Sequence, residues 1–168
     1  MSRRRSRRTY EHMNSVLSLV RKNGCMTMSQ VMNALSLSHS HVYYISKDMA
    51  NAGMISMIVI GKIAVLCADE DRAKRYIDEI AEMVHDIACR NGAKFIWPSK
   101  LLDMMDVKQR RKMEQYVGTR ITGRIGYIPS VLTFLGAVMR RIYGNPQRYR
   151  DHHMYVTNCN KKLRAGHV

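Results

Sequence analysis

The first part of the chain carries an apolar stripe at helical spacing. The i, i+3, i+4, i+7 pattern places side chains on one face of a helix, and it is followed by Met13, Val16, Leu17 and Val20. This pattern predicts a first helix over residues 10–22, which Asn23-Gly24 ends. Thr27 and Gln30 then have the spacing of a capping box, which predicts a short second helix.

The stretch LSLSHSHVYYISKDMANAG, residues 35–53, predicts a third helix with an unusual outer face. Val42, Ile45 and Met49 form its inward stripe, Ser38 can cap it, and Gly53 ends it. The outward positions hold short hydrogen-bonding groups and aromatic rings, where most helices hold charges: His39, Ser40, His41, Tyr43, Tyr44, Ser46 and Lys47.

Two β-branched runs follow, at residues 55–60 and 63–66. They flank Gly61-Lys62, and a glycine at the first turn position suits a tight hairpin. Both strands are so apolar that part of the hairpin is expected to be covered by the second half or by a partner subunit.

The second half of the chain predicts further helices. Acidic residues open a long one at residues 69–91. A short extended piece at 95–97 is followed by a helix from Pro98, a helix from 107 to about 121 that Asp106 can cap, and a last helix over 129–143. Residues 153–157 can form one strand. The chain is therefore expected to be mainly α with a small β-hairpin.

The charge of the chain indicates which class of partner it binds. The 168 residues carry a formal net charge of +15, and its clustering favours a polyanion such as nucleic acid. Residues 1–9 are expected to form a disordered basic arm, which can lie along phosphates or enter the minor groove through Arg3, Arg4, Arg5, Arg7 and Arg8.

The four cysteines lie far apart without a CxxC pair, so neither a zinc ribbon nor a redox pair is indicated. No signal peptide and no membrane-spanning run is visible. We therefore expect a protein of the cytoplasm, associated with the nucleoid, with reduced thiols.

The segment L37-S38-x-S40-x-V42-x-x-I45-S46-K47-x-M49-x-x-A52-G53-M54-I55 resembles the recognition-helix segment of winged helix-turn-helix DNA-binding proteins, a class that contains many bacterial and archaeal transcription regulators. The resemblance covers residues 10–68. It implies a mainly α fold with a small β-wing, a third helix in the major groove of double-stranded DNA, and a wing that places Lys62 beside a phosphate.

The residues of the third helix suit that role chemically. Ser, His and Tyr donate or accept hydrogen bonds, and Lys47 can pair with a phosphate or a guanine. The expected contacts on this helix are Ser38, His39, Ser40, His41, Tyr43, Tyr44 and Lys47. One of the two tyrosines is expected to be partly buried. His39 and His41 are not read as metal ligands, because no third ligand is placed nearby.

Residues 69–158 form the expected second domain, followed by a basic tail at 159–168. The region weakly repeats the plan of the first domain, and its third helix has a basic face with Lys108, Arg110, Arg111 and Lys112. It is either a second, tandem DNA-binding unit or a helical dimerisation region. A tandem unit would need a hairpin near residues 123–128, where the sequence leaves little room for one.

The leading expectation is sequence-specific binding of double-stranded DNA by a transcription regulator that can pair as a homodimer, with no cofactor, no metal and no membrane partner. Asp151, His152 and His153 lack the acidic cluster of a nuclease, so no enzyme is indicated. The run Arg148-Tyr149-Arg150 reads as a nucleic-acid contact. An architectural chromatin or replication-type protein with little sequence preference, and an RNA-binding ribonucleoprotein component, are the alternatives.

Overall fold

The computed structural model describes residues 6–121 and 129–160. Within them the chain is mainly helical with small antiparallel sheets. It divides into two compact units: residues Met1–Val59 with Ala64–Ala73, and residues Ile60–Ile63 with Lys74–Val168. The expected boundary between residues 68 and 69 lies a few residues earlier. Three further segments lie outside the described residues: Arg3, Arg4 and Arg5; residues 123–128, where a tandem unit would need a hairpin; and most of the basic tail.

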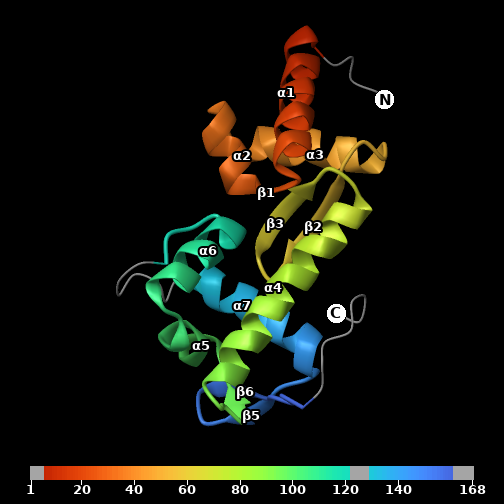
Figure 1. Cartoon of the computed structure of the whole chain (residues 1–168). Coiled ribbons are helices and arrows are strands. Elements are labelled where there is room, and N and C mark those ends of the chain that lie inside the picture. The colour runs from red at the N-terminus through yellow and green to blue at the C-terminus, as the bar shows by residue number, and fades with distance from the viewer. Residues whose placement is uncertain (1–5, 122–128, 161–168) are drawn as a thin grey trace. The chain divides into compact units, whose positions relative to one another are not determined.

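The first unit contains three helices and a small sheet (Figure 1). Its elements are α1 (Arg7–Asn23), β1 (Cys25–Thr27), α2 (Met28–Leu35), α3 (His39–Asn51), and β2 (Ser56–Ile60) and β3 (Ile63–Cys67) except for their turn ends at Ile60 and Ile63, which belong to the second unit. The sheet order is β1-β3-β2, and β1 pairs antiparallel with β3. Strand β1 was not predicted, whereas the hairpin and its Gly61-Lys62 turn were.

Side-chain caps fix the starts of these helices. The Thr27 hydroxyl and the Gln30 side chain form the predicted capping box at α2. Ser38 caps α3 by accepting a hydrogen bond from the His41 backbone N–H at 3.3 Å.

The prediction of a disordered arm was wrong for residues 7–9. Ser6 accepts a hydrogen bond from the Thr9 backbone N–H at 3.3 Å and caps α1, so the helix begins at Arg7. The Arg7 guanidinium also lies 3.4 Å from the Glu11 carboxylate, one turn along the helix.

The core of the first unit is made by the stripes that periodicity predicted. Its fully buried side chains come from all three helices and the sheet: Val16, Val20, Val31, Val42, Met49 and Leu66. Burying these side chains holds the three helices together, since each such residue contributes about 1.5–3 kcal/mol. The outer side of α3 is thereby fixed in direction.

The second unit combines four helices and a second sheet. Its elements are α4 (Glu70–Arg90, whose first turn belongs to the first unit), β4 (Phe95–Ile96), α5 (Pro98–Met104), α6 (Val107–Val117), α7 (Pro129–Tyr143), β5 (Gln147–Tyr149) and β6 (His152–Val156). The sheet order is β4-β6-β5, all antiparallel. The four helices were predicted, and β5 was not.

Aromatic hydroxyls tie α4 to α6 in this unit. The Tyr76 hydroxyl donates to the Tyr116 carbonyl, and the Tyr116 hydroxyl donates to Glu79 at 3.1 Å. Burial raises the pKa of Tyr76 strongly, and burial together with the Glu79 carboxylate raises the pKa of Tyr116 to about 12. Both hydroxyls therefore stay protonated donors at a pH near 10, where a free tyrosine is half ionised.

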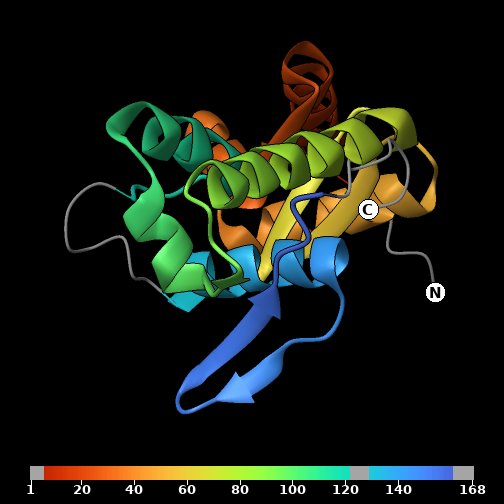
Figure 2. The same ribbon diagram turned by 60° about the horizontal axis from the view of Figure 1, so that its bottom comes forward.

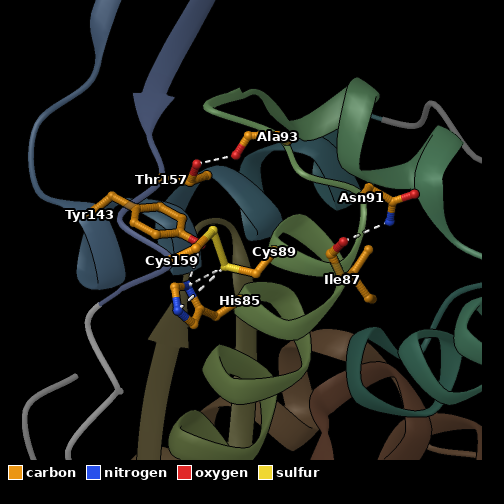
Figure 3. The surroundings of a disulfide bond; sticks show 8 residues. All are labelled: His85, Ile87, Cys89, Asn91, Ala93, Tyr143, Thr157 and Cys159. Carbon is orange, nitrogen blue, oxygen red and sulfur yellow. Dashed lines mark hydrogen bonds between the residues drawn. A yellow bond between two sulfur atoms is a disulfide. The ribbon is translucent and has the colours of Figure 1, made fainter.

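The prediction of reduced thiols was wrong, because the cysteines form the disulfides Cys25–Cys67 and Cys89–Cys159. The first joins directly paired residues of β1 and β3. The second joins α4 to the chain after β6, with His85 between it and the Tyr143 hydroxyl, 2.8 Å from the imidazole (Figure 3). Burial raises the pKa of Tyr143 to about 12. Disulfides are typical of oxidising compartments, but intracellular proteins of hyperthermophiles also carry them.

Candidate nucleic-acid interface

The outer side of α3 presents a patch of polar and aromatic side chains. Ser38, His39, Ser40 and Lys47 are exposed, and Tyr44 is 66% exposed. The capped start of the helix and the buried Val42 stripe set which way these residues face. We call these five residues the α3 outer face.

Tyr43 connects this face to the core. Its ring is half-buried against the hydrophobic cluster, stacks with His39 at a centroid distance of 6.3 Å, and meets the edge of Tyr44 at 5.7 Å. The Lys47 ammonium lies 5.9 Å from the Tyr43 ring centroid, within the range of a cation–π contact. One tyrosine is thus partly buried, as expected, and it braces the exposed neighbours.

Two predicted outward residues are not free. His41 is half-buried, and its Nε2 lies 2.7 Å from Nδ1 of His12 on α1, so one imidazole donates and the other accepts. Ser46 is fully buried, and its hydroxyl has no hydrogen-bond partner among the described residues. No sequence pattern indicates the His12 contact, because the two histidines lie on separate helices.

Two of the predicted contact arginines lie in the first turn of α1. Arg7 and Arg8 are both exposed. Because both residues belong to helix α1, their backbone has a fixed conformation, which the backbone of a disordered arm does not have.

Lys62 is exposed at the turn of the β2–β3 hairpin, but this turn belongs to the second unit. A Cβ atom on Gly61 would lie 2.9 Å from the backbone oxygen of Thr133 and the backbone nitrogen of Phe134. The turn thus packs tightly against α7. Part of the hairpin is covered, as its apolar strands indicated.

The basic residues of α6 are divided among different surroundings. The Arg110 guanidinium donates to the carbonyls of Leu102 at 2.8 Å and Ile121 at 3.3 Å. Arg111 is exposed. Lys108 and Lys112 line a cleft together with acidic residues: Glu79, Glu82, Asp86 and Asp106. Since carboxylates line the cleft too, α6 does not present a uniformly basic surface.

Metal-ligand clusters and membrane-spanning helices are both absent from the described residues. Within residues 6–121 and 129–160, no three His, Cys, Asp or Glu side chains gather closely enough to hold a metal ion. Nor does any helix of the described part have the length and apolar character needed to cross a membrane.

No family model matches the chain, and neither does any curated protein. Among solved structures, the chain is similar to the crystal structure of the hypothetical protein PyrSV_gp04 from Pyrobaculum spherical virus. The two share 26% sequence identity with a TM-score of 0.74, and the match covers 94% of this chain and 100% of that one. That protein is described only as hypothetical, so the likeness concerns the fold.

Proposed function

We propose that the first unit binds double-stranded DNA with sequence preference, as a winged helix-turn-helix transcription regulator. The observation that carries the proposal is the α3 outer face, where five side chains able to donate or accept hydrogen bonds are exposed along one helix. Such a face suits the major groove, where each base pair offers its own pattern of donors, acceptors and methyl groups.

The order of elements supports this proposal. The first unit runs α1-β1-α2-α3-β2-β3, and a short turn at residues 36–38 separates α2 from α3. A second helix that follows a tight turn and presents its outer side to DNA is the common feature of helix-turn-helix proteins. The β2–β3 hairpin that follows α3, which β1 extends to a three-stranded sheet, is the counterpart of a wing.

The proposed contacts form two groups. Contacts with phosphates set the affinity, and contacts with base edges set the sequence preference. Lys47 pairs with a phosphate or a guanine, whereas Tyr44, His39 and Ser40 meet base edges or thymine methyl groups. Arg7 and Arg8 add phosphate contacts. Lys62 belongs to the second unit, so its proposed phosphate contact is counted apart from the α3 outer face.

The test begins with selection of bound sequences from a random duplex pool, followed by affinity measurements on the enriched duplex at several salt concentrations. We expect an enriched motif, and we expect Lys47→Ala to weaken binding by about 5- to 100-fold. Lys22→Ala, which removes the same charge from α1, is the matched control and should change affinity less than twofold. Unchanged affinity of the Lys47→Ala variant would remove α3 from the site.

The same experiment separates the alternatives. Equal affinities for random and selected duplexes would identify an architectural protein without sequence preference. Stronger binding of RNA than of duplex DNA in competition would identify an RNA-binding component. A palindromic motif would indicate a homodimer, because the symmetry of a DNA site mirrors that of the protein.

A further inference from the structure

The sheet of the second unit has two chemically different faces. Side chains alternate along a strand, and directly paired residues of neighbouring strands share a face. Ile96 pairs with Tyr155, and both are buried. Phe95 pairs with Val156 on the opposite face, where they are 46% and 51% exposed. One face therefore belongs to the core, and the other is turned outward.

The outward face is rich in rings. Tyr149 pairs with His152 across β5 and β6, and both are exposed, Tyr149 by 55%. Trp97 follows β4 in extended conformation and stacks on His152 at a centroid distance of 5.0 Å. The hairpin that carries Tyr149 and His152 projects beyond α7 (Figure 2). We name this surface the ring face and define it as Phe95, Trp97, Tyr149 and His152.

Cations lie at both ends of the ring face. The Lys100 ammonium is 4.8 Å from the Trp97 ring centroid and donates to the Phe95 carbonyl at 2.9 Å, which leaves two of its N–H groups for a ligand. The Arg150 guanidinium lies 5.5 Å from the Tyr149 ring centroid. Lys94, next to Phe95, is exposed as well.

Arg150 occupies an unfavourable backbone conformation. Its φ is 54°, in the left-handed region that glycine or asparagine adopts more easily. The turn between β5 and β6 nevertheless places a guanidinium at the tip of the hairpin, beside an exposed tyrosine.

We propose that the ring face binds single-stranded nucleic acid, with bases stacked on its rings and phosphates held by Lys94, Lys100 and Arg150. Exposed rings on a small sheet, bordered by cations, are the combination that single-stranded polynucleotides require. A duplex does not satisfy these rings, because its bases are already stacked on one another. This site is separate from the α3 outer face and does not depend on it.

The space beside the ring face is consistent with this ligand. A cavity of about 550 Å³ is bounded by Trp97, His152, Gly136 and Arg140. Its volume falls in the range of small-molecule sites, so it has room for one nucleotide at the edge of the stacked rings. The Arg140 guanidinium there is held by the Asn145 side chain at 3.0 Å.

Trp97 makes the test direct, because it is the only tryptophan of the chain. The full chain is titrated with a twelve-nucleotide oligo-dT and with the corresponding oligo-rU, and tryptophan fluorescence is followed. We expect quenching by one or both oligonucleotides, whereas the duplex oligo-dA/oligo-dT should quench far less. A difference between dT and rU would tell which sugar the site prefers.

Variants of the exposed rings complete the test. Tyr149→Ala and Phe95→Ala should each weaken binding of the quenching oligonucleotide at least about fivefold, the lower limit for loss of one stacked base. Tyr149→Phe should bind like the original chain, because stacking does not need the hydroxyl. Tyr10→Ala, which removes a 54% exposed ring from α1, is the control and should leave this binding unchanged.

Absence of quenching and of binding at low salt, or alanine variants that bind normally, would overturn the proposal. Self-association that Tyr149→Ala abolishes, without any oligonucleotide binding, would identify a protein contact and also overturn it. Neither outcome affects duplex binding by α3, which Lys47→Ala tests separately.

Discussion

Ser46 shows how helical periodicity outweighs the polarity of a single residue. It lies four positions after Val42 and three before Met49, which places it within the inward stripe of α3. Its polar side chain suggested an outward position, but three apolar stripe residues determine how the helix packs. The result is a buried hydroxyl without a hydrogen-bond partner among the described residues.

Ser46→Ala should therefore stabilise the protein. Alanine removes an unsatisfied buried hydroxyl and has the higher helix propensity, so the free energy of unfolding should rise by about 1 kcal/mol. Denaturant unfolding measures the change. The control Ser40→Ala, at an exposed position of the same helix, should change the free energy of unfolding by less than about 0.5 kcal/mol. A loss of stability in Ser46→Ala would show that the hydroxyl is hydrogen-bonded.

Arg110 and its neighbour Arg111 have different roles. Arg110 binds backbone carbonyls inside its unit, whereas Arg111 is exposed on the surface. Arg110→Ala leaves the Leu102 and Ile121 carbonyls without their guanidinium donor and should cost about 1–3 kcal/mol. Arg111→Ala should change the free energy of unfolding by less than about 0.5 kcal/mol. Equal effects of the two substitutions in denaturant unfolding would contradict the assignment.

The raised pKa values of three tyrosines predict how the stability of the protein changes at alkaline pH. The pKa values of Tyr116 and Tyr143 are about 12 in the folded chain, and that of Tyr76 is raised as well, whereas an unfolded tyrosine titrates near 10. The unfolded state thus loses these protons first. Stability from these groups should be complete below pH 10 and decline as the pH rises toward 12.

Tyrosinate absorbance against pH checks this directly. Some of the nine tyrosines should ionise near pH 10, and the buried ones only close to the pH of unfolding. Tyr143→Phe should remove one of the late-titrating groups. A single transition near pH 10, with the fold intact, would be inconsistent with the buried hydroxyls.

At the scale of elements, local signals predicted most of the structure. The capping box at Thr27, the cap at Asp106 and the stop at Gly53 involve neighbours within three or four residues, so the sequence displays them directly. Strands β1 and β5 have three residues each and form only through partners distant in the chain. No local pattern could predict them.

The turn of the β2–β3 hairpin offers a test at this scale. Gly61 and Gly53 both have φ near +70°, at 64° and 74°, but only Gly61 has backbone within 4 Å of its missing Cβ. Gly53→Ala should lower the free energy of unfolding by about 1–2 kcal/mol, because alanine must adopt the left-handed conformation. Gly61→Ala should cost more, because Thr133 and Phe134 must also shift. Equal melting temperatures of the two variants would mean that the turn does not pack on α7.

At the scale of the whole molecule, contacts between distant residues limited what the sequence could predict. The stripe and cap of α3 predicted most of its outer face, whereas the His12–His41 contact, both disulfides and the ring face join separate elements. The sequence separations of the disulfides are 42 and 70 residues, and no short cysteine motif marks them.

Removing either disulfide should lower stability substantially. Loops of 42 and 70 residues correspond to about 4 kcal/mol each in the chain-entropy model. Replacing Cys25 and Cys67 together by alanine should lower the melting temperature. Replacing Cys89 and Cys159 together should lower it as well. Melting temperatures equal to that of the original chain would show that the thiols are normally reduced.

Accessibility sets the order in which a reductant acts. Cys159 is exposed, whereas Cys67 is fully buried, so the Cys89–Cys159 bond should open first under mild dithiothreitol treatment. Alkylation followed by mass spectrometry identifies the opened pair. Earlier labelling of Cys67 would reverse this expectation.

Each disulfide joins two cysteines of the same unit, and all four cysteines are used, so no covalent bridge other than the main chain connects the two units. A calorimetric scan should then resolve two heat-absorption peaks. Opening the Cys89–Cys159 bond alone should move one peak and leave the other in place.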